Sequence, residues 1–123
     1  MRLFFLFSII LLSSFAGCDV SAQTSTPAAA PGRLKTYLIE RDIPGAGQLS
    51  ATDLKGISQR SCSVLKEMGP GITWLQSYVL GNKIFCVYTA ENENLLREHA
   101  AKGGFPIAAI SEIVSTIGPK TAE

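Results

Sequence analysis

The sequence has few of the residues from which catalytic and metal sites are usually built. Its 123 residues include one histidine, one tryptophan and three cysteines. No two cysteines have the CxxC spacing of a zinc knuckle or a thioredoxin-like redox site. The sequence also shows no arrangement of Ser, His and Asp typical of a catalytic triad. It has no glycine-rich phosphate-binding loop after a predicted strand. We therefore predict that the protein is not an enzyme.

A surplus of basic charge is missing as well. Lys and Arg number 11 and Asp and Glu number 10, so the chain has no excess of positive charge to place along a phosphate backbone. We expect no nucleic-acid partner. Hydrophobic residues make up 46% of the sequence, which is enough for the core of one domain at this length.

Residues 1–17 predict a signal peptide, because Arg2 precedes an apolar run that is too short for a membrane span. The run ends in Phe15-Ala16-Gly17-Cys18, which is similar to a bacterial lipobox and implies a lipid on Cys18. A competing cleavage site follows Ala22 and would release a soluble periplasmic or secreted protein. We expect the first outcome, an exported lipoprotein of the cell envelope that the lipidated Cys18 holds at the membrane.

Residues 18–34 are small, polar and interrupted by proline, which is typical of a flexible tether. Residues 35–117 read as the folded domain, and residues 118–123 as a polar tail. Ser50 and Asp53 form a capping box for a helix that ends at Gly69, and Asn92 is the N-cap of a second helix. The predicted strands cover residues 35–41, 72–79, 83–89 and 108–117.

The order strand, helix, strand, strand, helix, strand predicts an α+β fold, the ferredoxin-like split βαβ sandwich (βαββαβ). Its four-stranded antiparallel sheet carries two helices on one face. Simple alternation places Trp74 and Tyr78 on one face of their strand and Leu75 and Val79 on the other. Because two helices cover only one of these apolar faces, we expect a homodimer in which a second copy covers the other.

Two cysteines lie within the predicted domain. The helical pattern places Cys62 on the inward face of the first helix, above the strand that carries Cys86. A Cys62–Cys86 disulfide would then be within reach, and an exported protein meets oxidising conditions. Two free buried thiols and metal ligation are the alternatives that the sequence leaves open.

Four stretches carry a resemblance to a known family: YLIERDIPGAG at residues 37–47, ISQRSCSVLKEMGP at 57–70, WLQSYV at 74–79 and FCVYTAENENLLREHAAKGGFP at 85–106. Together they resemble small bacterial nickel-binding or nickel-responsive proteins, once filed as a domain of unknown function. The resemblance implies a ferredoxin-like fold, a dimer of the dimeric α/β-barrel type and a nickel ligand. The export signal departs from the family's usual cytosolic form.

His99 is the residue whose chemistry best suits nickel(II) or another divalent transition metal, because these ions accept neutral imidazole readily. Glu40, Cys86 and Tyr78 are the candidate partners by topology. The competing interpretation is a core histidine that makes one hydrogen bond. We thus expect a small metal-binding protein of the envelope. A structural or protein-interaction lipoprotein and, by fold analogy, a cofactor-free oxygenase are the alternative functions.

Overall fold

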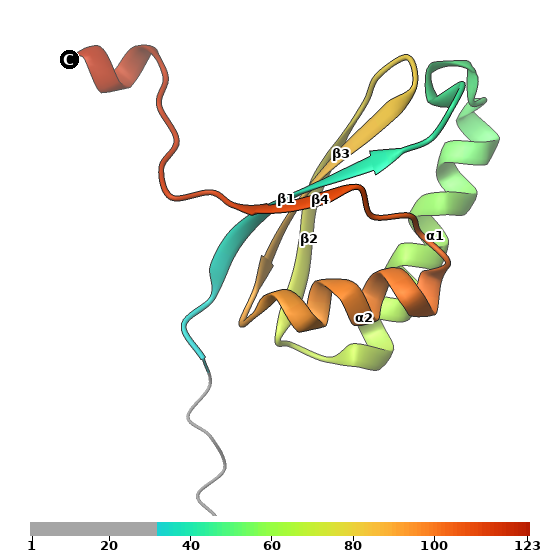
Figure 1. The fold of residues 1–123 in the computed structure, drawn as a ribbon, viewed down its shortest axis with the longest axis horizontal. Helices are drawn as coiled ribbons and strands as arrows, with labels where there is room; N and C mark the ends of the chain where they lie inside the picture. The colour runs from blue at the N-terminus through green and yellow to red at the C-terminus, as the bar shows by residue number, and fades with distance from the viewer. Residues whose placement is uncertain (1–31) are drawn as a thin grey trace, which may run out of the picture.

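A computed structural model describes residues 32–123 of the chain, and the predicted signal peptide, Cys18 and most of the tether lie outside these residues. The sheet contains β1 (Lys35–Asp42), β2 (Ile72–Val79), β3 (Lys83–Ala90) and β4 (Ala109–Glu112) in the order β2-β3-β1-β4. Every neighbouring pair of strands is antiparallel. The helices are α1 (Ala51–Met68) and α2 (Glu93–Gly103), and both pack on the same side of the sheet (Figure 1). The predicted ferredoxin-like split βαβ fold is confirmed.

The predicted caps set the ends of both helices. The Ser50 side chain accepts from the backbone N–H of Asp53, and the Asp53 carboxylate accepts from Ser50 in return. The Asn92 side chain accepts from the backbone N–H of Leu95. Short 3-10 helices follow β1 at Ala46–Gln48 and close the chain at Pro119–Ala122. Among residues 32–123 no helix is long and apolar enough to cross a membrane.

The core lies between the helices and one face of the sheet. Alternate residues of β3 are buried there, namely Ile84, Cys86, Tyr88 and Ala90. Leu96, in the first turn of α2, is fully buried against them. No helix of residues 32–123 covers the other face of the sheet (Figure 1).

The last strand is shorter than the predicted 108–117. Tyr37 pairs with Glu112, and the backbone N–H of Ile113 donates to the carbonyl of Thr36. Because β1 begins at Lys35, a longer β4 would run past the end of β1, the strand with which it pairs. Beyond this point the chain leaves the domain and extends away from it (Figure 1), with the Val114 side chain 89% exposed.

The predicted face of one strand is wrong for a local reason. A β-bulge shifts the register of β2 between Trp74 and Gln76. Trp74 therefore pairs with Tyr88 on the helix-covered face, while Tyr78 pairs with Phe85 on the open face. Simple alternation placed Trp74 and Tyr78 together, but one extra residue in a strand reverses the side to which all later residues point.

Candidate ligand cavity

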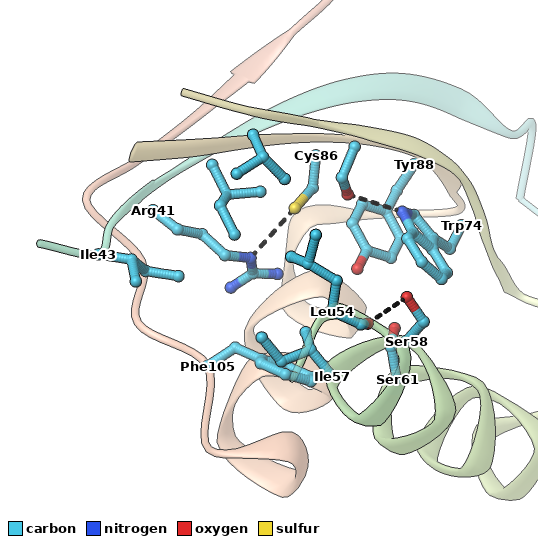
Figure 2. A pocket seen from close by; sticks show the side chains of 13 residues that line it. Arg41, Ile43, Leu54, Ile57, Ser58, Ser61, Trp74, Cys86, Tyr88 and Phe105 are labelled. Atoms are coloured by element: carbon cyan, nitrogen blue, oxygen red, sulfur yellow. Dashed lines mark hydrogen bonds between the residues drawn. The ribbon is translucent and has the colours of Figure 1, made fainter. Parts of the chain in front are cut away.

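A cavity of about 140 Å³ lies between α1 and the helix-covered face of the sheet (Figure 2). Its walls are mainly apolar and include Leu54 and Ile57 from α1 and Ile84 from β3. Ser58 and Ser61 stand on the same face of α1, and their short side chains do not fill the space above the sheet. The cavity thus forms where small helix residues face the strands.

One charged side chain enters this cavity. Arg41 is the last inward-facing residue of β1, after Tyr37 and Ile39, and only 3% of its surface is exposed. Its Nη1 donates to the carbonyl of Pro106 at 2.8 Å, and its Nε lies 3.4 Å from the Cys86 sulfur. Among the described residues its Nη2 has no hydrogen-bond partner. Figure 2 shows the guanidinium pointing between the sheet and α1.

The charge of Arg41 has no counter-ion within the described residues. No carboxylate of residues 32–123 lies within ion-pair distance of its guanidinium. Buried charges in proteins are normally paired, because removing an unpaired charge from water costs several kcal/mol. An exception of this kind marks a candidate functional group.

His99 lies beside the cavity and is completely buried. Its Nε2 is 3.1 Å from the Ser61 hydroxyl, and its Nδ1 has no partner among the described residues. Its ring packs between neighbours, with the centroids of Tyr88 and Phe105 each 5.3 Å away. Burial, assisted by the positive charge of Arg41, lowers the pKa of His99 to about 4, although the backbone of Ser61 acts in the opposite direction. The imidazole is therefore neutral at neutral pH.

Tyr88 contributes a second polar group at the same place. Its phenol oxygen points into the cavity from β3 (Figure 2). Burial raises the pKa of Tyr88, while the nearby Ser61 and Arg41 act in the opposite direction. The phenol is therefore protonated at neutral pH and remains available as a hydrogen-bond donor.

Comparison with known proteins identifies the family to which the chain belongs. The sequence profile described as "Nickel responsive protein SCO4226-like" matches residues 37–113, which span the sheet and both helices. The chain belongs to this family. A crystal structure of SCO4226 from Streptomyces coelicolor A3(2) superposes with a TM-score of 0.57 at 13% identity, and the match covers 67% of this chain and 99% of that one. At this identity the similarity shows the fold. A comparison with curated proteins finds no match.

The residues predicted to hold nickel in this member of the SCO4226-like family are not brought together. Glu40 lies on the open face of the sheet, where it forms an ion pair with Lys83. Tyr78 also lies on the open face and is 53% exposed. His99 and Cys86 are on the helix-covered side, but the Cys86 sulfur contacts Arg41. Within residues 32–123 no group of three or more His, Cys, Asp or Glu side chains could hold a metal ion.

The predicted disulfide is not formed either, because the helix face was placed wrongly. Both Cys62 and Cys86 are free, and Cys62 is exposed whereas Cys86 is buried. The buried residues of α1 are Ser61 and Val64. Cys62 follows Ser61 by one residue, a turn of roughly 100° around the helix axis, and so points away from the sheet.

Sequence reasoning missed Arg41 as a site residue. The signal was present, since Tyr37, Ile39 and Arg41 alternate along β1 and all three are buried. A charged residue at the end of an apolar stripe indicates either the edge of the core or a functional group. The loop at Phe105 and Pro106 covers the guanidinium of Arg41. This contact shows that Arg41 is a buried group of the site and does not mark the edge of the core, and it cannot be seen in the sequence of β1.

Proposed function

We propose that this member of the family is an exported, non-catalytic binding protein and that the cavity between α1 and the sheet is its ligand site. The observation that supports this proposal is the buried guanidinium of Arg41 in an otherwise apolar cavity. Ligand sites are commonly concave and apolar, with a few polar groups that fix orientation. The cavity has this composition.

An enzyme is the weaker alternative, although one pair of residues resembles a catalytic one. Ser61 and His99 are at the distance of a nucleophile and its base. However, a pKa near 4 makes His99 a poor base at neutral pH. Its Nδ1 also has no carboxylate beside it to orient the ring among the described residues. This arrangement favours a packing role for the pair.

Nickel is the ligand that the family description suggests. His99 has one property that nickel requires, a neutral imidazole, but the residues around it are aromatic rings and a hydroxyl rather than thiolates or carboxylates. The described residues of one protomer therefore do not fit a nickel site at His99. We propose that the cavity, and not a metal cluster within one protomer, is the binding site of this chain.

A nickel titration followed by calorimetry tests this choice. Wild-type protein and His99→Ala are expected to give the same isotherm, because His99 is buried and has no co-ligands. Saturable binding with one ion per chain that His99→Ala abolishes would restore the metal site predicted from the sequence. The titration is repeated with reductant, so that oxidation of the exposed Cys62 does not contribute heat.

Binding in the cavity is tested with benzyl alcohol, an uncharged probe with a benzene-sized body. A cavity of roughly 150 Å³ is large enough for benzene, and the cavity between α1 and the sheet has a volume of about 140 Å³. We expect saturable quenching of Trp74, which is the only tryptophan and lines the cavity. Val79→Phe should weaken this binding because Val79 lines the cavity, whereas Leu80→Phe, one residue further along, should not. Unsaturable quenching that is equal in all three proteins would contradict the proposal.

A further inference from the structure

We propose that the natural ligand of the cavity is a small organic monoanion whose carboxylate binds Arg41 and whose apolar body lies against Trp74 and Ile84. This inference rests on the proposed function, because it names the ligand class of the same site. The observation behind it is the Nη2 of Arg41, which has no hydrogen-bond partner among the described residues. The Arg41 side chain is only 3% exposed and points into the cavity (Figure 2).

The charge balance selects an anion. Two nitrogens of the Arg41 guanidinium already contact protein groups, and both of these groups, the Pro106 carbonyl and the Cys86 sulfur, are acceptors. The third nitrogen, Nη2, is unpartnered among the described residues. A carboxylate at Nη2 would supply both a charge-assisted hydrogen bond and the missing negative charge.

The remaining polar groups of the cavity are compatible with a carboxylate. The phenol of Tyr88 is held in its protonated form by burial, and it points into the same space. The hydroxyl of Ser61 is close to the imidazole of His99. The Tyr88 hydroxyl can donate a hydrogen bond, so a carboxylate has a donor besides Arg41. No acidic side chain of the described residues lines the cavity to repel it.

Size and wall chemistry restrict the class further. The volume of about 140 Å³ holds a benzene-sized or short-chain body and excludes nucleotides and long acyl chains. Inorganic phosphate or sulfate would place a strongly hydrated ion against Trp74, Ile84 and Leu54, at a large desolvation cost. A dicarboxylate would bring two charges to one guanidinium. A small monocarboxylate with an apolar body matches both the single cation and the apolar walls.

The cavity also reaches the surface, which a ligand requires for entry. Val79 lines it from β2 and is 42% exposed. The neighbouring Ile43, which lies between β1 and the first 3-10 helix, is half-buried and lines the same side. We therefore expect a ligand to enter past Val79.

Three probes with the same ring and different charges test the inference: benzoate, benzyl alcohol and benzylamine. Each is titrated into the full mature protein at neutral pH and followed by Trp74 fluorescence and calorimetry. In the wild type we expect benzoate to bind at least about tenfold more tightly than benzyl alcohol, as one charge-assisted hydrogen bond provides. Benzylamine should bind least well, because its cation meets Arg41.

Arg41→Met removes the charge but keeps an apolar chain of similar length. We expect this change to weaken benzoate binding about tenfold or more and to leave the affinity for benzyl alcohol within about threefold. Arg97→Met is the matched control, because it removes an equal charge from the exposed face of α2 and should change neither affinity. Circular dichroism of each variant is the check that it is folded. Val79→Phe provides a second variant, which should weaken both probes together.

The outcomes separate this inference from the proposed function. If benzyl alcohol binds and responds to Val79→Phe, but benzoate is no tighter or is unaffected by Arg41→Met, the carboxylate assignment is wrong and the cavity remains a ligand site. If none of the probes binds saturably, the proposed function itself is overturned. Equal losses of benzoate affinity in Arg41→Met and Arg97→Met would also overturn the assignment, because they would indicate a general effect of net charge.

Discussion

The guanidinium of Arg41 lies over the ring of Phe105, 5.2 Å from its centroid. The same ring stacks on the buried His99. Phe105 follows the last turn of α2, where its backbone N–H donates to the carbonyl of Ala100. One aromatic side chain after a helix thus covers both the charged group of the cavity and the histidine beside it.

The first prediction concerns the space that Phe105 occupies. A Cβ at Gly103 would lie 2.2 Å from the Phe105 ring. Gly103→Ala should therefore displace the ring and lower the free energy of unfolding by about 2 kcal/mol, as overpacking typically does. Gly56→Ala is the control, because a Cβ there meets nothing within 4 Å, and it should raise stability by about 0.5 kcal/mol or more. Urea denaturation measures both changes, and equal behaviour of the two variants would contradict the packing described.

The second prediction is a pH dependence of stability. The pKa of His99 falls from 6.5 to about 4 in the folded protein, so between these two pH values the unfolded chain binds the proton more readily. The contribution of His99 is therefore complete above pH 6.5 and is lost as the pH falls toward 4, by about 3 kcal/mol. His99→Gln should remove this part of the pH dependence. Parallel stability curves for the two proteins from pH 7 to 4.5 would refute it.

The third prediction concerns the cost of the unpaired charge. Arg41 is buried without a counter-ion among the described residues, so Arg41→Met should raise the free energy of unfolding of the ligand-free protein by about 1 kcal/mol. The gain is limited because the bond to Pro106 is lost. Chemical denaturation measures this change, with Arg97→Met expected to be nearly neutral. A marked loss of stability in Arg41→Met would assign Arg41 a structural role.

The fourth prediction is the dimer. The open face of the sheet carries the half-buried Leu38 and Val87 and the exposed Tyr78. We expect a dimer by light scattering at micromolar concentration, in which a second copy covers this face. Val87→Asp should give a folded monomer because it places a charge at the centre of the face, and Ala101→Asp on the exposed side of α2 should not. A monomeric wild-type protein would be evidence against the proposal.

The fifth prediction concerns the N-terminus, which lies outside the described residues. If Cys18 is lipidated, the mature protein begins at Cys18 and sediments with membranes. Cys18→Ala should move it to the soluble fraction without changing the fold of the domain. Mass spectrometry of the native protein provides the check, since a mature chain that begins at Gln23 would show ordinary signal cleavage.

Local signals were sufficient to predict most of the fold. The capping box at Ser50 and the glycine at Gly69 give the ends of α1 within one residue, and the alternation of β3 gives its buried face. Each of these signals depends on neighbouring residues alone. The family resemblance pointed to the same topology.

The site was less predictable because it depends on how distant segments meet. The bulge places Tyr78 on the open face of the sheet, and no residue of β2 predicts this bulge. Cys62 lies next to Ser61, but only Ser61 belongs to the buried face of α1. Arg41 acquires its importance from the loop at Phe105, more than sixty positions later in the chain. Sequence spacing within one element cannot report such a contact.

The bulge in β2 has a further consequence for how copies of this protein meet. β2 is an edge strand, and a regular edge offers a row of free backbone donors and acceptors to which another chain can add. The irregularity between Trp74 and Gln76 interrupts that row. If Cys18 is lipidated as predicted, copies of the protein would be concentrated in the plane of a membrane, where such additions would extend into insoluble sheets. We therefore expect the bulge to limit open-ended aggregation, while the face of the sheet remains free for the proposed closed pair.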